Sequence, residues 1–213
     1  MIWLSKDVHL QMAGFLLATI AWILSSTSMG LVQWRVWYQD RPLRSYPSTA
    51  FVGMWRVCVY HHASNSSRAQ WCLPYTYRDA WLPVDIRVSQ HLLLAASILG
   101  LFAKALTIFA LRNVHMGRLK KTACNPFVLS GSLNLLVSSC VLVPVLFSYH
   151  SITNFKETAF SSAFPVPFKP DTQKIGSALV VATVGAFLFF LSGIIFFSYP
   201  VPLDITVYPE DSK

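Results

Sequence analysis

Two cysteines with a glycosylation sequon between them are the residues best placed to do chemistry. Cys58 and Cys72 have thirteen residues between them, and these include Asn65-Ser66-Ser67. A pair of thiols can oxidise to a disulfide, and Asn-X-Ser accepts an N-linked glycan; both reactions belong to the secretory pathway and the cell exterior. We therefore expect a Cys58–Cys72 disulfide and a candidate glycosylation site at Asn65.

The sequence shows no arrangement typical of an enzyme or a metal centre. The apolar segments contain no paired carboxylates, and no Ser/His/Asp or Cys-X-X-Cys pattern occurs. His61 and His62 are adjacent, so on a strand they would point to opposite faces and could not share an ion. We expect no catalysis, no metal and no cofactor.

A third cysteine has a different expected role. Cys124 follows Lys120 and Lys121 at the edge of a predicted membrane span, which makes it a candidate for palmitoylation. Cys140 lies inside that span, where no disulfide is expected.

Composition indicates that these residues are carried by membrane helices. The chain is 54% hydrophobic and only 12% charged, whereas soluble domains carry about 25% charged residues. Four apolar segments, at about 10–32, 88–111, 127–149 and 176–199, are each long enough for a bilayer core. Backbone polar groups in lipid must pair within the segment, so all four are predicted helices. The first is too long for an ordinary signal-peptide core and is expected to be retained.

The basic residues predict how these helices are oriented. The loop 112–126 carries Arg112, Arg118, Lys120 and Lys121 and no acid, so it is expected in the cytoplasm, together with 1–9 and 200–213. The extracellular loops are then 33–87 and 150–175. We assign the net charge of +8 to these loops and flanks, and expect no nucleic-acid partner.

The first extracellular loop has the pattern of a small antiparallel β-sheet. Phe51 to Tyr60 alternates two faces and is predicted as one strand, and Trp71 to Tyr77 is predicted as its returning partner. Leu31 to Tyr38 is predicted as a further strand. The hairpin places both cysteines on neighbouring strands, and a disulfide closing so short a loop stabilises by about 3 kcal/mol in the chain-entropy model. The predicted fold is one domain, 1–213: a left-handed four-helix transmembrane bundle with an extracellular sheet.

The first outer loop resembles the claudin family. Claudins carry a Trp, then Gly-Leu-Trp, two residues and a Cys, a second Cys, and an Arg near the start of the second helix. The matching residues are Trp34, Gly53, Met54, Trp55, Cys58, Cys72 and Arg87. The segment 174–179 also looks like the family's entry into the fourth helix. The signature is shared with a wider superfamily of peripheral myelin proteins and calcium-channel gamma subunits.

This resemblance implies a structural protein of tight junctions. Such a protein sits among plasma-membrane lipids at cell–cell contacts, and it associates with itself or other claudins in cis and in trans. By lateral polymerisation it would mediate adhesion and form a paracellular barrier or a charge-selective path. The alternatives are an auxiliary subunit of a channel or receptor, and an adhesion protein that does not polymerise.

Charge and aromatic residues suggest where such contacts and selectivity would lie. The first outer loop has seven arginines and three aspartates, a net charge of 7 − 3 = +4. Family selectivity charges often follow each cysteine, but here those positions are Val59 and Leu73, so Arg68 and Arg78 are the candidate paracellular charges. The second outer loop carries a candidate adhesive patch. Its residues are Phe155, Phe160, Phe164 and Phe168.

A few single residues have two possible roles. Trp34, Gly53 and Trp55 are expected to be structural. Arg87 could snorkel to the interface or anchor helix to sheet, and Lys104 is expected to snorkel out of its span. The last residue, Lys213, is not apolar, so scaffold binding to PDZ domains through the C-terminus is not expected.

Overall fold

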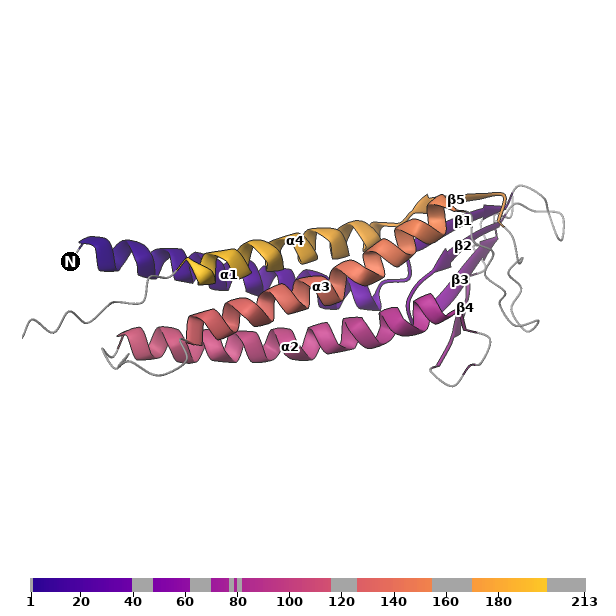
Figure 1. The fold of residues 1–213 in the computed structure, drawn as a ribbon. Helices are drawn as coiled ribbons and strands as arrows, with labels where there is room; N and C mark the ends of the chain where they lie inside the picture. The colour runs from indigo at the N-terminus through magenta and orange to yellow at the C-terminus, as the bar shows by residue number, and fades with distance from the viewer. Residues whose placement is uncertain are drawn as a thin grey trace, which may run out of the picture.

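In the computed structural model the chain forms four long helices with a sheet at one end (Figure 1). The structure describes residues 2–39, 48–61, 70–76, 79, 82–115, 126–154 and 170–198. The helices are α1 (Ile2–Gly30), α2 (Val84–His115), α3 (Pro126–Thr153) and α4 (Ser177–Phe197). The strands are β1 (Arg35–Gln39), β2 (Ser48–Val52), β3 (Arg56–His61), β4 (Gln70–Pro74) and β5 (Thr172–Ile175).

All four helices are long and apolar enough to cross a membrane, which agrees with the predicted fold of four membrane helices. The helices do not begin and end at the limits of the predicted apolar segments, and the first begins as early as Ile2. The second helix begins at Val84 rather than 88, because the acidic Asp85 is well tolerated in a first helical turn. The first helix ends at Gly30, two residues earlier than predicted.

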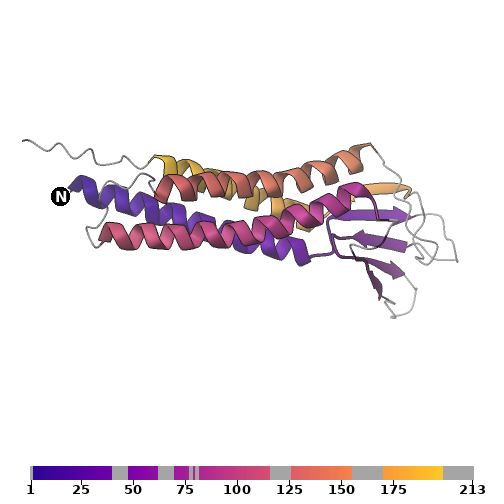
Figure 2. The ribbon, with the colours of Figure 1, turned by 60° about the horizontal axis from the view of Figure 1, so that its bottom comes forward.

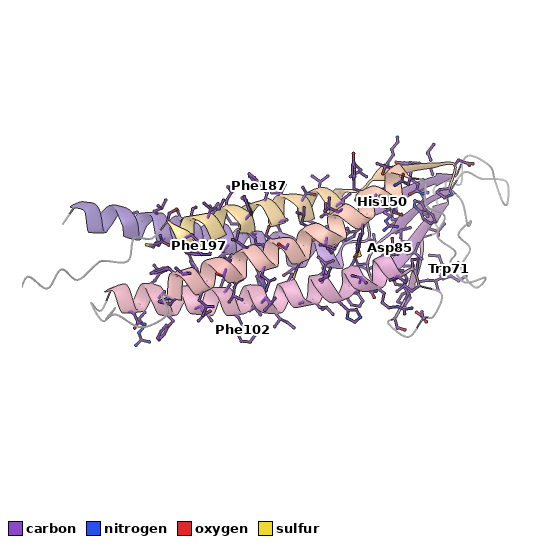
Figure 3. The ribbon with its side chains drawn as sticks, viewed as in Figure 1. Trp71, Asp85, Phe102, His150, Phe187 and Phe197 are labelled. Carbon is purple, nitrogen blue, oxygen red and sulfur yellow. A yellow bond between two sulfur atoms is a disulfide. The ribbon has the colours of Figure 1, made fainter. Side chains whose placement is uncertain are left out.

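A stripe of small residues on α4 lies inside the bundle, and several large apolar side chains lie on the outside of the bundle. Ala178, Ala182 and Ala186 recur every fourth residue of α4 and are all buried, as expected for a small-residue stripe that lets helices approach closely. Phe102 and Phe187 are exposed and point away from the bundle, where lipid would lie (Figure 3).

Serine hydroxyl groups form hydrogen bonds between helices inside the bundle. Ser138 donates to the carbonyl of Ala186, and Ser192 donates to the carbonyl of Gly14, both at 2.8 Å. Such bonds between helices are a common means of association in lipid, where apolar burial provides little drive.

Contrary to the prediction, Lys104 does not snorkel out of its helix. Its ammonium group is buried and lies 3.9 Å from the centre of the Trp22 ring on α1. The Trp22 indole is held in turn by a 3.0 Å hydrogen bond to the carbonyl of Ser97. Within the described residues the charge is therefore met by an aromatic face rather than by the membrane surface.

The sheet is antiparallel throughout, in the order β4-β3-β2-β1-β5 (Figure 2). The prediction of one strand from Phe51 to Tyr60 is wrong. A tight turn at Gly53 separates β2 from β3, and the Gly53 N–H donates to the carbonyl of Arg56 at 3.0 Å. A side chain at Gly53 would meet the Val32 backbone at 2.8 Å, so only glycine allows the turn to approach the end of α1 this closely.

The second outer loop contributes a strand that was not predicted from the sequence. The short strand β5 pairs with β1, with Arg35 opposite Ile175. Its four residues, TQKI, are too few to show a clear alternation, so the pairing with β1 determines its conformation.

Candidate functional site

The candidate site is the sheet together with the contacts that hold it on the helices. Cys58 and Cys72 occupy directly paired positions on β3 and β4 and form a disulfide, as predicted. The bond closes the hairpin whose connecting residues include the sequon. The disulfide therefore holds β3 and β4 together at one edge of the sheet.

Trp34 ties the start of β1 to the end of α1. Its side chain is buried, and its indole N–H donates to the carbonyl of Ser28 at 2.8 Å. The carbonyl of Trp34 also accepts a hydrogen bond from the N–H of Gly176, which lies just before α4. This signature residue thus joins the first helix, the sheet and the fourth helix.

Hydrogen bonds from α2 and from the residue that follows β4 hold the Gly53-Met54-Trp55 turn in place. Gln90 of α2 donates its amide to the carbonyl of Met54 at 2.6 Å. Tyr75, which follows β4, donates its hydroxyl to the carbonyl of Gly53, and its N–H donates to the carbonyl of Trp55 at 3.0 Å. Burial raises the pKa of Tyr75 above its ordinary value, against the opposing effect of Arg35, so the phenol stays a neutral donor.

The charged contact at the centre of this site was not predicted from the sequence. Arg35, the first residue of β1, is buried and forms a 3.0 Å ion pair with Asp85 in the first turn of α2. Its other terminal nitrogen donates to the hydroxyl of Ser151 on α3 at 2.8 Å. In the sequence, both residues fall among the charges of the first outer loop. One feature of the sequence could have predicted this contact. A single acidic residue in the first turn of a membrane helix indicates a basic partner nearby.

Arg87 binds backbone rather than projecting to the interface. One terminal nitrogen lies 3.0 Å from the carbonyl of Asp79 and 3.4 Å from that of Leu82. These bonds hold the connection between β4 and α2. The geometry favours the role of an anchor over snorkelling.

Several predicted residues lie outside the part of the chain that the structure describes. They are Asn65, Arg68, Arg78, Cys124, Phe155, Phe160, Phe164, Phe168 and Lys213. Among the described residues, no three His, Cys, Asp or Glu side chains gather as metal ligands would.

Comparison with known proteins agrees with this geometry. A family model described as PMP-22/EMP/MP20/Claudin matches residues 8–196. The chain belongs to this family. The matched residues include most of α1, nearly all of α4, the whole of α2 and α3 and all five strands, with the tryptophans and cysteines described above.

Individual claudins are distant relatives. Claudin-19 of Mus musculus is 28% identical over 194 residues, which cover 86% of this chain and 78% of that protein. Claudin-3 of Canis lupus familiaris is 25% identical over 88% of this chain and 81% of its own length. Claudin-18 of Mus musculus is 27% identical over 68% of this chain, but the match spans only about half of its own length, 53%. The chain is a claudin-like multi-pass membrane protein.

Proposed function

We propose that this protein is a structural component of tight junctions that mediates cell–cell adhesion. It polymerises laterally with itself or with other claudins in the plasma membrane, and the polymer seals the space between cells. Membership of the family supports this role, as does the position of the sheet at one end of the membrane helices (Figure 1). On this proposal the sheet end faces the extracellular space.

The observation that carries the proposal is an exposed aromatic residue on an edge strand. Strands β4 and β5 form the two edges of the sheet. Trp71 on β4 is 58% exposed, and it is labelled at the outer end of the molecule in Figure 3. Edge strands and exposed aromatic side chains favour association with another chain. Trp71 is therefore our main candidate contact between neighbouring molecules.

The residues after the cysteines favour a barrier over a selective path. Val59 is buried, and Leu73 packs against the same apolar cluster. Neither offers a fixed charge to a passing ion. A path would therefore depend on other residues of the outer loops, of which Arg68 and Arg78 are the candidates.

Expression in cells that lack junctional strands tests the proposal. Freeze-fracture microscopy should show continuous strands at contacts between expressing cells. Trp71→Ala should shorten or abolish these strands, whereas Arg56→Ala, an exposed change on the adjacent strand, should leave them intact. Surface biotinylation is the control, and it should find both variants at the plasma membrane. Absence of strands from the parent protein, with co-purification of a channel, would instead favour the auxiliary-subunit role.

A further inference from the structure

A groove opens between two helices at the sheet end of the bundle. Its volume is about 530 Å³, within the range of small-molecule sites. Asp85 on α2 and His150 on α3 lie near each other at this end (Figure 3). The complete lining is Val84, Asp85, Val88, Leu146, Phe147 and His150.

The polar residues of the lining lie at its sheet end. Asp85 and His150 are found there, beside the apolar Val84 that begins α2. Val88 on α2 and Leu146 on α3 lie about one helical turn further into the bundle, a distance of about 5 Å. The groove therefore has the polarity of an amphiphile that stands with its head at the membrane surface.

The groove meets lipid rather than water along most of its length. Both walls belong to helices that can span the membrane, Val84–Asn113 and Pro126–Thr153. Val84 is 72% exposed and Leu146 is 54% exposed, so both present apolar surface outward. The molecules available to fill the groove are the lipids of the leaflet on the sheet side.

The charge on the groove selects among those lipids. In the ion pair, the Arg35 side chain is only 3% exposed, whereas that of Asp85 is 22% exposed. The lipid therefore meets the carboxylate and not the guanidinium group. A phospholipid would place its anionic phosphate beside this acid, which is unfavourable. A small neutral head with a hydroxyl donor is favoured.

We propose that this groove binds a sterol. The sterol hydroxyl donates to the carboxylate of Asp85 and accepts from the imidazole of His150. The flat ring system lies against Val88, Leu146 and Phe147 and continues into the leaflet. This site does not depend on the junctional role, because it uses only the two helices and one end of the ion pair.

Photolabelling in nanodiscs tests the site. The full-length protein is placed in phosphatidylcholine nanodiscs that contain a diazirine-bearing cholesterol, and labelled peptides are mapped after irradiation. Label should concentrate on the α2 peptide that contains Val84 and Val88. Leu146→Trp, which fills the groove, should remove most of that label. Leu142→Trp adds the same bulk to another exposed position of the same helix, one turn away, and should leave it unchanged. Equal melting temperatures without sterol show that both variants fold.

Competition with unlabelled lipids tests which head group the groove binds. Unlabelled cholesterol should displace the probe, whereas its 3-keto analogue, which has no hydroxyl donor, should compete at least about tenfold more weakly, the ratio expected for one hydrogen bond to a charged carboxylate. His150→Ala, which removes a neutral hydrogen bond, should weaken labelling about fivefold. Label spread evenly over all lipid-facing helices, or unaffected by Leu146→Trp, would overturn the site. Equal competition by the keto analogue would overturn the hydroxyl contact with Asp85, and equal competition by ceramide would overturn the assignment to a sterol.

Discussion

Arg35 and Asp85 lie 50 positions apart in the sequence and join the sheet to the helices through one partly buried ion pair with a 3.0 Å separation. Arg35 begins the strand that pairs with both β2 and β5. Asp85 lies in the first turn of α2, where the helix dipole also favours a negative charge. Ser151 of α3 completes the contact, so one guanidinium group links the sheet to two helices.

The first prediction concerns this ion pair. Arg35→Ala should leave the Asp85 carboxylate largely buried without a partner and lower the free energy of unfolding by about 3 kcal/mol. The melting temperature in detergent micelles measures the loss. Arg56→Ala removes an exposed arginine from the same sheet and should change stability by less than about 0.5 kcal/mol. Equal melting temperatures for the two variants would contradict the role of the ion pair.

The disulfide supports the second prediction. Cys58→Ser should lower the free energy of unfolding by about 3 kcal/mol, because the bond closes a short loop. Replacement of Cys140, a free thiol on α3, is the matched control and should cost much less. Mass mapping without reductant should find Cys58 and Cys72 in one cross-linked peptide pair. Free thiols at both positions in the mature protein would rule the bond out.

Gly176 gives a prediction about close packing between the sheet and α4. A Cβ atom at this position would lie 1.9 Å from the carbonyl oxygen of Gln33, so no side chain fits without moving the backbone. Gly176→Ala should therefore prevent stable folding and cell-surface delivery. Gly30→Ala is the matched control, because nothing lies within 4 Å of its added methyl group. Normal surface levels of Gly176→Ala would show that this junction can move apart.

Periodicity and composition predicted the helices and the disulfide well, since both depend on local patterns. Long apolar runs admit one structure in lipid, and the two cysteines lie on a recognisable hairpin. The turn at Gly53 was missed because the alternation of Phe51 to Tyr60 continues through it unbroken. That turn is imposed by the approach to Val32 and by the carbonyl bonds of Gln90 and Tyr75.

Charges were the least predictable feature of the sequence. Arg35 and Asp85 look like ordinary outer-loop residues, and only the fold brings them together. Lys104 was expected to reach the membrane surface, but Trp22, 82 positions earlier in the sequence, provides a closer partner. Contacts between residues so far apart leave no periodic signal in the chain.

Lys104 and Trp22 form the subject of a fourth prediction, tested by a double-mutant cycle. The buried ammonium group faces the indole ring at 3.9 Å, and a desolvated contact of this kind is worth about 2 kcal/mol. Trp22→Leu should therefore destabilise the parent protein more than it destabilises the Lys104→Met variant, which keeps the length of the side chain without its charge. The cycle also cancels the lost bond from Trp22 to Ser97. A coupling energy near zero would mean that the ring only fills space.

The last prediction concerns charge selectivity. The ion pair removes one charge of each sign from the first outer loop, so six arginines and two aspartates remain and the net charge is still 6 − 2 = +4. The guanidinium group of Arg87 also donates hydrogen bonds to backbone carbonyls. Among the arginines of this loop that the structure describes, only Arg56 is exposed.

Dilution potentials across an epithelial sheet that expresses the protein distinguish a barrier from a path. A path lined by this loop would favour chloride, because fixed positive charge attracts anions and repels cations. Arg68→Glu or Arg78→Glu should then reduce the preference for chloride, whereas a change at buried Arg35 would act through folding and is no test of selectivity. Arg56→Glu shows whether any exposed arginine of the sheet has the same effect. Buried Val59 and packed Leu73 lead us to expect the other outcome, a higher electrical resistance with unchanged selectivity in the parent and in all three variants. No change in either quantity on expression of the parent would remove the junctional role.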